Sequence, residues 1–279
     1  MSEKKNIIEV YTNCYAEHGL WAAIDGAAAA GLKHLEVAMK THGGELVVVE
    51  DGILSESARA EDIRRLKERL AEKGLVISSA NGGADMRERE GVDLVKRRMA
   101  VAAQVGAKHF MIAGMHYNRE ETIRNHFREV ADCAREHGMI IALETHPTLM
   151  HNADEILKTI DFFAHDAIRV NFDTANIYYH NESSIDMLKE LERVKHLVGH
   201  VHLKDCRLQY HDWFFPALGK GKIDFPRTFE VLNGAGFFGP FSIEIEGIAG
   251  EKPDLETRQS WVRESVEYLA EIGVLQGQS

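Results

Sequence analysis

The stretch AAAAGLKHLEV, residues 27–37, has the pattern of a helix end, a glycine and then a buried strand. The same plan recurs in AAQVGAKHFMI at 102–112, AEKGLVIS at 71–78, AREHGMIIALE at 134–144 and LNGAGFFGPFSIEIE at 232–246. Glycine adopts the left-handed conformation past a helix end at little cost, so it turns the chain toward the next strand. A module of helix, glycine and apolar strand, used this often, predicts parallel strand–helix units with right-handed crossovers.

Short β-branched runs alternate with amphipathic helical segments along the chain. We expect strands over residues 6–12, 34–39, 75–79, 109–114, 139–144, 168–173, 199–205 and 240–246. We expect helices near residues 18–30, 60–73, 87–105, 119–137, 152–163, 183–194, 225–235 and 255–272. Eight such units predict an α/β fold, a single (β/α)8 TIM barrel.

A doubly wound open sheet is the structural alternative to the barrel. That fold normally carries a glycine-rich phosphate loop after its first strand, and YTNCYAEHGL at 11–20 contains none. No linker, low-complexity tract or shift in composition divides the chain. We therefore expect one domain over residues 1–279.

Composition excludes several classes of partner. The chain is 44% hydrophobic and 28% charged, with a net charge of −11, which repels phosphate backbones, so no nucleic-acid partner is expected. No apolar run approaches the roughly 18 residues of a membrane span, and MSEKKNIIEV is too charged for a signal peptide. The three cysteines lack CxxC spacing. We expect no membrane association and a cytoplasmic location.

Polar side chains stand at the ends of the last four predicted strands. They are Glu144 and His146 in IIALETH, Asp173 and Asn176 in RVNFDTAN, His200, His202 and Lys204 in GHVHLKD, and Glu244 and Glu246 in FSIEIEG. Earlier strands add Glu36 in HLEVAM, Asn81 in ISSANGG and His116 in IAGMHYN. In a barrel these ends meet at one face, where catalytic groups cluster.

Several carboxylates and an imidazole in one cavity need a counter-charge, and a divalent cation is the simplest one. We predict a four-ligand site made by Glu144, Asp173, His202 and Glu244. Carboxylate oxygens with one imidazole suit one Mn²⁺ ion first, with Mg²⁺, Co²⁺ and Zn²⁺ as alternatives. Taken alone, each carboxylate can instead cap a helix or pair with a lysine. His200 is expected to be structural, because only one of two histidines on the same face need reach the cavity centre.

These motifs also resemble a known family. ALETHP, NFDTAN, GHVHLKDCR, LGKGKIDFP and GPFSIEIEG, in that order, are similar to the xylose-isomerase-like TIM-barrel superfamily, most clearly over residues 139–247. It contains the sugar phosphate isomerase/epimerase-like proteins, ketohexose 3-epimerases, inosose dehydratases and endonuclease IV. The resemblance implies the same four ligands, with His202 chosen by its place in the motif and Glu244 by its distance from the preceding Gly-Pro. It also implies that Glu144 and Glu244 form the acid/base pair, as in the family's epimerases.

The sequence departs from two branches of the superfamily. Endonuclease IV and the ketohexose 3-epimerases have a histidine three residues after the strand-6 aspartate, where this chain has Asn176. LQYHDWFF lacks the Asp-x-His pair of endonuclease IV, and Met150 replaces the second glutamate of the epimerases. HLKDCR is closer to the inosose dehydratases, and an abasic-site endonuclease is the least expected function.

The predicted site suits proton abstraction next to a carbonyl. We expect a divalent-metal-dependent sugar isomerase or epimerase that acts on a keto-sugar, a related polyol or a cyclitol through a metal-stabilised enediolate. Glu144 and Glu244 would remove and return the proton. A lyase or dehydratase of the same chemistry is the alternative, and a metal-bound sugar-binding subunit without chemistry is a third reading.

Five further side chains are expected to contact the substrate: His116, His146, Asn176, Lys204 and Arg207. The alternative for the two histidines is that they only line the cavity, and the alternative for Lys204 is an ion pair with Asp205 or Glu246. The aromatic loop over residues 208–222 is expected to lid the site or to form an interface. An exposed patch in this loop, at WFF (213–215), would favour a homo-oligomer.

Overall fold

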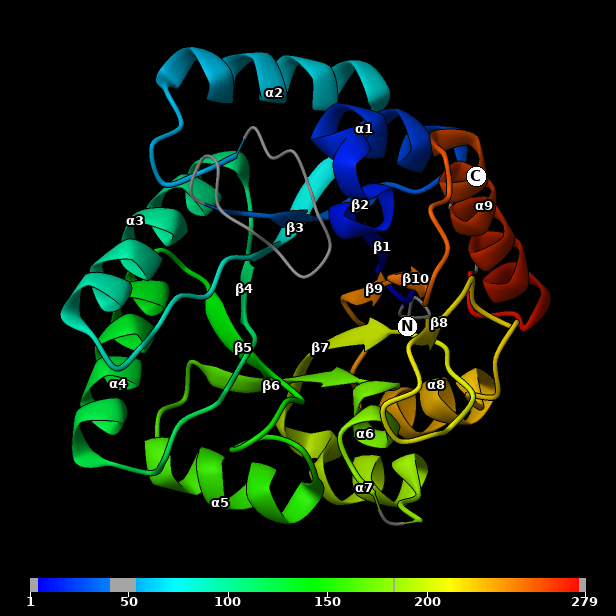
Figure 1. The fold of residues 1–279 in the computed structure, drawn as a ribbon. Coiled ribbons are helices and arrows are strands. Elements are labelled where there is room, and N and C mark those ends of the chain that lie inside the picture. The colour runs from blue at the N-terminus through cyan, green and yellow to red at the C-terminus, as the bar shows by residue number, and fades with distance from the viewer. Residues whose placement is uncertain (1–4, 41–53, 183, 276–279) are drawn as a thin grey trace.

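Eight parallel strands close into a barrel in the order β1-β2-β3-β4-β5-β6-β7-β9 (Figure 1). The computed structural model describes residues 5–40, 54–182 and 184–275. The barrel strands are β1 Ile8–Tyr11, β2 His34–Ala38, β3 Val76–Asn81, β4 His109–Ile112, β5 Ile140–Glu144, β6 Ile168–Asp173, β7 Val198–Leu203 and β9 Phe241–Ile243. This topology confirms the (β/α)8 fold expected from the repeated junctions.

Helices surround the barrel (Figure 1). They are α1 Gly19–Ala29, α2 Ala60–Lys73, α3 Arg89–Val105, α4 Glu121–Glu136, α5 Ala153–Phe163, α6 Asn176–Tyr179, α7 Met187–Val194, α8 Phe225–Gly234 and α9 Leu255–Glu271, with 3-10 segments η1 Thr12–His18 and η2 Lys195–Leu197. Among the described residues, no helix has the length and apolarity needed to cross a membrane. Outside the barrel, the short strands β8 Phe214–Phe215 and β10 Gly247–Ile248 pair with each other.

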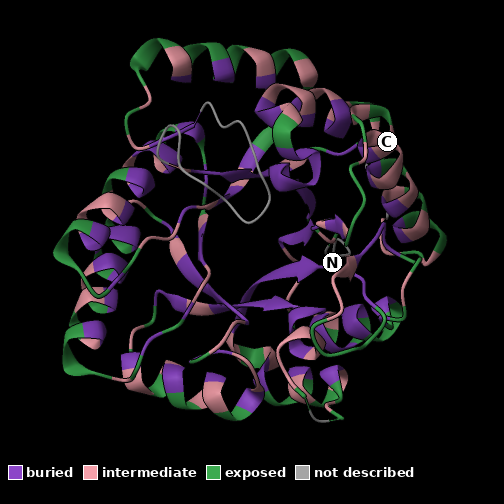
Figure 2. Cartoon of the chain, viewed as in Figure 1, coloured by how far each residue is buried: buried purple, intermediate pink, exposed green. Residues whose placement is uncertain are grey.

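Local sequence explains how each unit begins and ends. Gly74 and Gly106 follow α2 and α3 with φ of 65° and 107°, the left-handed conformation that the repeated glycines predicted. In α4, Ile123, Phe127 and Val130 recur at helical spacing and are buried. Figure 2 shows the same division in the other helices, which are buried toward the strands and exposed on the outside.

The interior of the barrel is polar over part of its height. Glu9, Glu36, His200 and His202 are all completely buried. His200 Nε2 lies 2.7 Å from Glu9 Oε1, although β9 separates β7 from β1 in the sheet. The contact must therefore pass through the centre of the barrel, where bulky branched side chains are the usual filling.

Five of the predicted strands, β1, β2, β4, β7 and β9, end one to three residues earlier than expected. β7 stops at Leu203, not at residue 205, because the Asp205 carboxylate turns to accept backbone N–H groups from Gly219, Gly221 and Ile223. The eighth barrel strand, β9, stops at Ile243, not at residue 246, because the chain beyond it pairs with β8. Both β8 and β10 are absent from the sequence prediction.

The sixth unit also differs from the prediction. The helix expected over 183–194 begins at Met187, where the Asp186 side chain accepts hydrogen bonds from Leu188 N and Lys189 N. Residue 183 and the two ends of the expected domain, 1–4 and 276–279, lie outside the described residues. A short helix that the sequence did not predict, α6, directly follows the end of β6.

A charged cluster between α4 and α5 gives a testable contribution to stability. Hydrogen bonds from Lys158 and Arg119 lower the pKa of Glu155 to about 2. Since the pKa is lower in the folded state, the stabilisation is complete above the ordinary value of 4.5 and is lost as the pH falls toward 2. We expect Glu155→Gln to lower the free energy of unfolding at pH 7 by about 1 kcal/mol, the group being near the surface.

Urea unfolding at pH values from 7 to 3 measures this effect. The difference between wild type and Glu155→Gln should shrink below pH 5. Glu68→Gln, which removes the exposed pair with Arg64, is the matched control and should change little at any pH. A Glu155→Gln difference that stays constant down to pH 3 would show that the carboxylate charge is not the cause.

Candidate metal centre

The four predicted ligands converge at one end of the barrel. Glu144 and Asp173 are the last residues of β5 and β6, His202 lies in β7, and Glu244 directly follows β9. All four are buried, and each offers a ligand atom within 4.8 Å of the others. Consecutive strands of the barrel thus bring together residues that are up to 100 positions apart.

Hydrogen bonds from neighbouring residues orient the carboxylates. Asp173 Oδ1 accepts from the backbone N–H groups of Ala175 and Asn176 at 2.8 and 2.9 Å. The Asn176 side chain donates to Glu144 Oε1 at 3.0 Å, and Asn13 Nδ2 donates to Glu244 Oε1 at 2.8 Å. One oxygen of Asp173, Oδ1, therefore caps the start of α6, and the other oxygen, Oδ2, is left to bind a cation.

The remaining oxygen atoms fit a cation. Asp173 Oδ2 and Glu244 Oε2 are buried and accept no hydrogen bond from the described residues, although Lys204 Nζ lies 3.5 and 3.4 Å from them. A buried oxygen in this state is costly, and a positive ion between the carboxylates would satisfy it. His202 Nδ1 lies 3.1 Å from Glu244 Oε2 and 3.6 Å from Glu144 Oε1, so an imidazole nitrogen faces the same space. The donor set of oxygens and one nitrogen suits Mn²⁺, Mg²⁺, Co²⁺ or Zn²⁺.

Burial and neighbouring charges shift the pKa values of Asp173 and Glu244 in opposite directions. Burial raises the pKa of Asp173 well above its ordinary value, and the negative charges of Glu244 and Glu144 add to the rise, against the opposing charge of Lys204. Burial acts in the same direction on Glu244, but Lys204 and His202 hold the pKa of Glu244 well below its ordinary value. The site is therefore an acidic cluster in which added positive charge would stabilise Asp173 as a carboxylate.

Lys204 is the positive charge already present at the site. Its Nζ lies 2.7 Å from Glu246 Oε2, 3.4 Å from Glu244 Oε2 and 3.5 Å from Asp173 Oδ2. Burial alone would lower the pKa of Lys204, but these carboxylates raise it well above its ordinary value. Of the two predicted ion-pair partners, Glu246 is the one that Lys204 contacts.

Three histidines, His116, His146 and His180, contact one another beside the strand-end cluster. The ring centroid of His146 lies 6.1 Å from that of His116 and 4.5 Å from that of His180. Burial lowers the pKa of His146, and burial together with the charges of His146 and Lys204 lowers the pKa of His180 to about 3. Both rings are therefore neutral near pH 7, so each can donate one hydrogen bond and accept another.

Arg207 lies apart from the cluster. Its side chain is half exposed, and the guanidinium stacks over the Phe214 ring at 3.7 Å from the centroid. In the same loop, Trp213 and Phe214 are half-buried and Phe215 is buried. The aromatic run is therefore not an exposed patch, and Phe215 lies against Lys204, with Nζ 4.5 Å from the ring centroid.

Sequence reasoning did not find several residues that contact the candidate ligands or the adjacent His146. Asn13, in η1, and His180, after α6, belong to no motif, and Tyr11 stacks on the His202 ring at a centroid distance of 5.6 Å. Glu36 was visible as a charged residue inside an apolar strand, but its contact with His202 Nε2 at 3.0 Å depends on the closure of the barrel.

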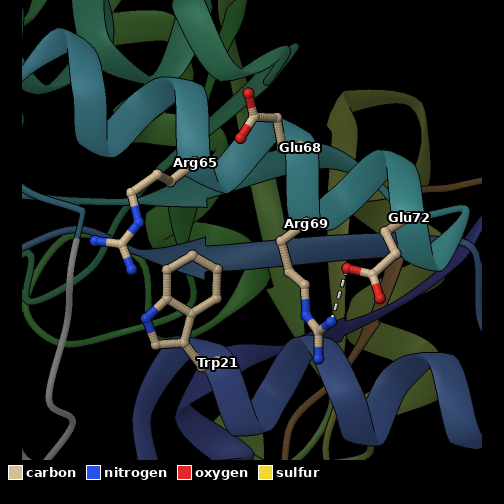
Figure 3. A pocket seen from close by; sticks show the side chains of 5 residues that line it. All are labelled: Trp21, Arg65, Glu68, Arg69 and Glu72. Carbon is tan, nitrogen blue, oxygen red and sulfur yellow. Dashed lines mark hydrogen bonds and ion pairs between the residues drawn. The ribbon is translucent and has the colours of Figure 1, made fainter.

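A separate surface hollow lies between α1 and α2, where Trp21 faces Arg65, Glu68, Arg69 and Glu72 (Figure 3). Its charged side chains largely pair with one another or with neighbours on these helices, as in the contact of Arg69 with Glu72 at 2.8 Å. This hollow belongs to the outer helical layer. The buried strand-end cluster is therefore the better candidate for chemistry.

Comparison with known proteins identifies the family. The pattern of the family described as xylose isomerase-like TIM barrel matches residues 24–272. The chain belongs to this family. Among curated proteins, it is 31% identical over 138 residues to an inosose dehydratase from Erwinia tasmaniensis, an alignment that covers 43% of this chain and 45% of the relative. The chain thus spans about half the length of the curated relatives it matches.

Solved structures of the family share the fold over nearly the whole chain. A D-allulose 3-epimerase from Methylomonas sp. is 19% identical with a TM-score of 0.72, covering 98% of this chain and 100% of that one. A xylose isomerase-like TIM barrel protein from Mycobacterium smegmatis, solved in complex with magnesium, is 16% identical with a TM-score of 0.72, covering 96% of both chains. At these identities the likeness concerns the fold alone.

Metal binding can be tested by thermal unfolding. We expect added Mn²⁺ to raise the Tm of the wild-type protein and EDTA to reverse the rise, because an ion bound only to the folded state stabilises it. Asp173→Asn should abolish the Mn²⁺-dependent rise, while its amide oxygen still accepts the two backbone N–H groups at the start of α6.

Asp205→Asn is the matched control, because Asp205 is equally buried but bonds the backbone of residues 219–223. It should lower the Tm yet keep the response to Mn²⁺. An unchanged response in Asp173→Asn would rule out this aspartate as a ligand.

Proposed function

We propose that the protein is a divalent-metal-dependent enzyme that removes a proton next to the carbonyl of a keto-sugar, a related polyol or a cyclitol. The observation that carries this proposal is the convergence of Glu144, Asp173, His202 and Glu244, all buried, within 4.8 Å of one another. A divalent cation held there, with Mn²⁺ first among the candidates, would act as a Lewis acid toward the carbonyl oxygen of the substrate.

Glu144 and Glu244 are the proposed acid/base pair. Burial raises the pKa of a carboxyl group, but contact with His202 holds the pKa of Glu144 below its ordinary value, and Lys204 and His202 do the same for Glu244. Both carboxylates are therefore ionised near pH 7, so either can accept the first proton, and the other must take up a proton from solvent before it acts as the acid. Asn176 and Asn13 each hold one oxygen of the pair, so the other oxygen has a defined direction.

Lys204 supplies a second positive charge for the substrate. Its buried ammonium has Glu246 as the nearest partner and also reaches Glu244 and Asp173. We assign it to the oxygen on which negative charge develops as the proton leaves. His146, whose Nδ1 is buried and has no hydrogen-bond partner in the described parts of the chain, is assigned to a substrate hydroxyl, with His116 and His180 beside it.

The proton can be returned in different ways. Return to the same carbon on its other face gives epimerisation, and return to the neighbouring carbon gives isomerisation; these are the two outcomes expected from the sequence. Dehydration is the second candidate, in which a hydroxyl group on the next carbon leaves as water. It is favoured by the inosose dehydratases among the sequence relatives.

Solvent exchange tests the shared first step. We expect the wild-type protein with Mn²⁺ to exchange a substrate α-proton with D₂O in a panel of keto-sugars and inososes. Glu144→Gln and Glu244→Gln should each slow this exchange by about 10²- to 10⁴-fold, the usual contribution of a positioned acid or base. The exposed Glu251→Gln is the control and should exchange at the wild-type rate.

The product then separates the two outcomes. Deuterium in a sugar isomer indicates epimerisation or isomerisation, whereas loss of water and a new near-ultraviolet absorbance from a conjugated C=C–C=O group indicate dehydration. Full activity in both glutamine variants would contradict the two-glutamate mechanism. Sugar binding without any exchange would favour the sugar-binding subunit instead.

A further inference from the structure

A buried carboxylate lies directly behind the histidine of the candidate centre. Glu36, on β2, is completely buried, and its Oε1 and Oε2 lie 3.1 and 3.0 Å from His202 Nε2. The other ring nitrogen, Nδ1, faces Glu244 and Glu144. One edge of the imidazole therefore contacts Glu36, and the opposite edge points into the candidate metal centre.

Residues from several strands hold the His202 ring in this orientation. β2 and β7 are not neighbours in the sheet, so the contact between Glu36 and His202 crosses the interior. Tyr11 stacks on the imidazole with an angle of 15° between the planes, and Asn171 Nδ2 lies 3.3 and 3.4 Å from its two nitrogens, Nδ1 and Nε2. These contacts leave the ring little freedom to rotate.

The position of Glu36 selects the tautomer of His202. An imidazole that binds a metal is neutral: it carries a hydrogen on only one nitrogen, and the ligating nitrogen keeps a lone pair. Both oxygens of Glu36 are acceptors beside Nε2, so the hydrogen belongs there and the lone pair belongs on Nδ1. A carboxylate acceptor behind a metal-binding imidazole also increases the basicity of the ligating nitrogen.

We propose that Glu36 is a positioning residue for the metal, which acts by fixing the orientation and tautomer of His202. The proposal rests on the proposed function, because it requires the centre to bind a divalent ion. Glu36, His200 and His202 also satisfy the distances of a metal-binding group. However, Glu9 lies 2.7 Å from His200 and Glu36 lies 3.0 Å from His202, so hydrogen bonds already account for this layer.

The test compares two equivalent substitutions in the barrel interior. Glu36→Gln removes the carboxylate behind His202, and Glu9→Gln removes an equally buried carboxylate that contacts His200. By calorimetric titration, we expect Glu36→Gln to weaken Mn²⁺ binding by about 10- to 100-fold and Glu9→Gln by less than about threefold. The visible spectrum of bound Co²⁺ should change in Glu36→Gln and not in Glu9→Gln.

Two further measurements cover a variant that fails to fold. Glu36→Asp keeps the charge but withdraws the oxygens from Nε2, so its Mn²⁺ affinity should be intermediate. In the ¹⁵N-labelled wild-type protein loaded with Zn²⁺, NMR should show His202 protonated at Nε2 and bound through Nδ1.

The outcomes separate this inference from the proposed function. Wild-type Mn²⁺ affinity in Glu36→Gln or Glu36→Asp would overturn the positioning role, as would equal weakening in Glu36→Gln and Glu9→Gln. An Nδ1-protonated His202 in the Zn²⁺-loaded protein would also overturn it. If the wild-type protein binds no Mn²⁺, the proposed function fails instead.

Discussion

The structure depends on how the barrel accommodates several buried carboxylates at the ends of neighbouring strands. Two unit charges 4 Å apart interact by about 4 kcal/mol at an effective dielectric constant of about 20, so like charges in this cluster are costly unless positive charge offsets them. Lys204 provides part of the compensation, with Nζ within 3.5 Å of Glu244, Glu246 and Asp173. Glu244 also faces His202, which explains why its pKa falls while burial raises the pKa of Asp173.

The barrel interior contains a second polar layer next to the strand-end carboxylates. Glu9 contacts His200 and Glu36 contacts His202, in both cases across the interior between strands that are not neighbours. Such groups are expensive to bury unless each has a partner, so the layer holds particular side chains in particular orientations. The apolar faces of the same strands, including Leu35 and Val201, are completely buried and pack toward the helices. The strand-end side chains are therefore held in place both by this interior polar layer and by the loops that follow the strands.

Much of this architecture could be predicted from the sequence because it repeats. The helix, glycine and strand modules predicted the eight units, and the strand-end residues Glu144, Asp173, His202 and Glu244 do converge in the structure. Convergence follows from the parallel order of the strands alone, since their carboxyl ends meet at one face. Lys204 was ambiguous because the sequence does not show that Asp205 turns toward residues 219–223 and leaves Glu246 as the partner.

The missed features depend on three-dimensional closure and not on local pattern. AAAAGLKHLEV predicted the fold, yet the role of its Glu36 became visible only when β2 was placed opposite β7. Asn13 contacts Glu244 from a 3-10 segment and His180 contacts His146 from the residue after a short helix, and neither segment has a periodic signal. The pairing of β8 with β10 joins segments over 30 residues apart, so neither was recognisable as a strand.

We expect a divalent ion to occupy the space between Glu144, Asp173, His202 and Glu244. Anomalous diffraction at the manganese edge, from crystals of the wild-type protein grown with Mn²⁺, tests it most directly. We expect one peak at about 2.0–2.4 Å from a carboxylate oxygen of each acid and from His202 Nδ1. A Mn²⁺ peak located elsewhere, or this space filled by the Lys204 ammonium with no peak, would contradict it.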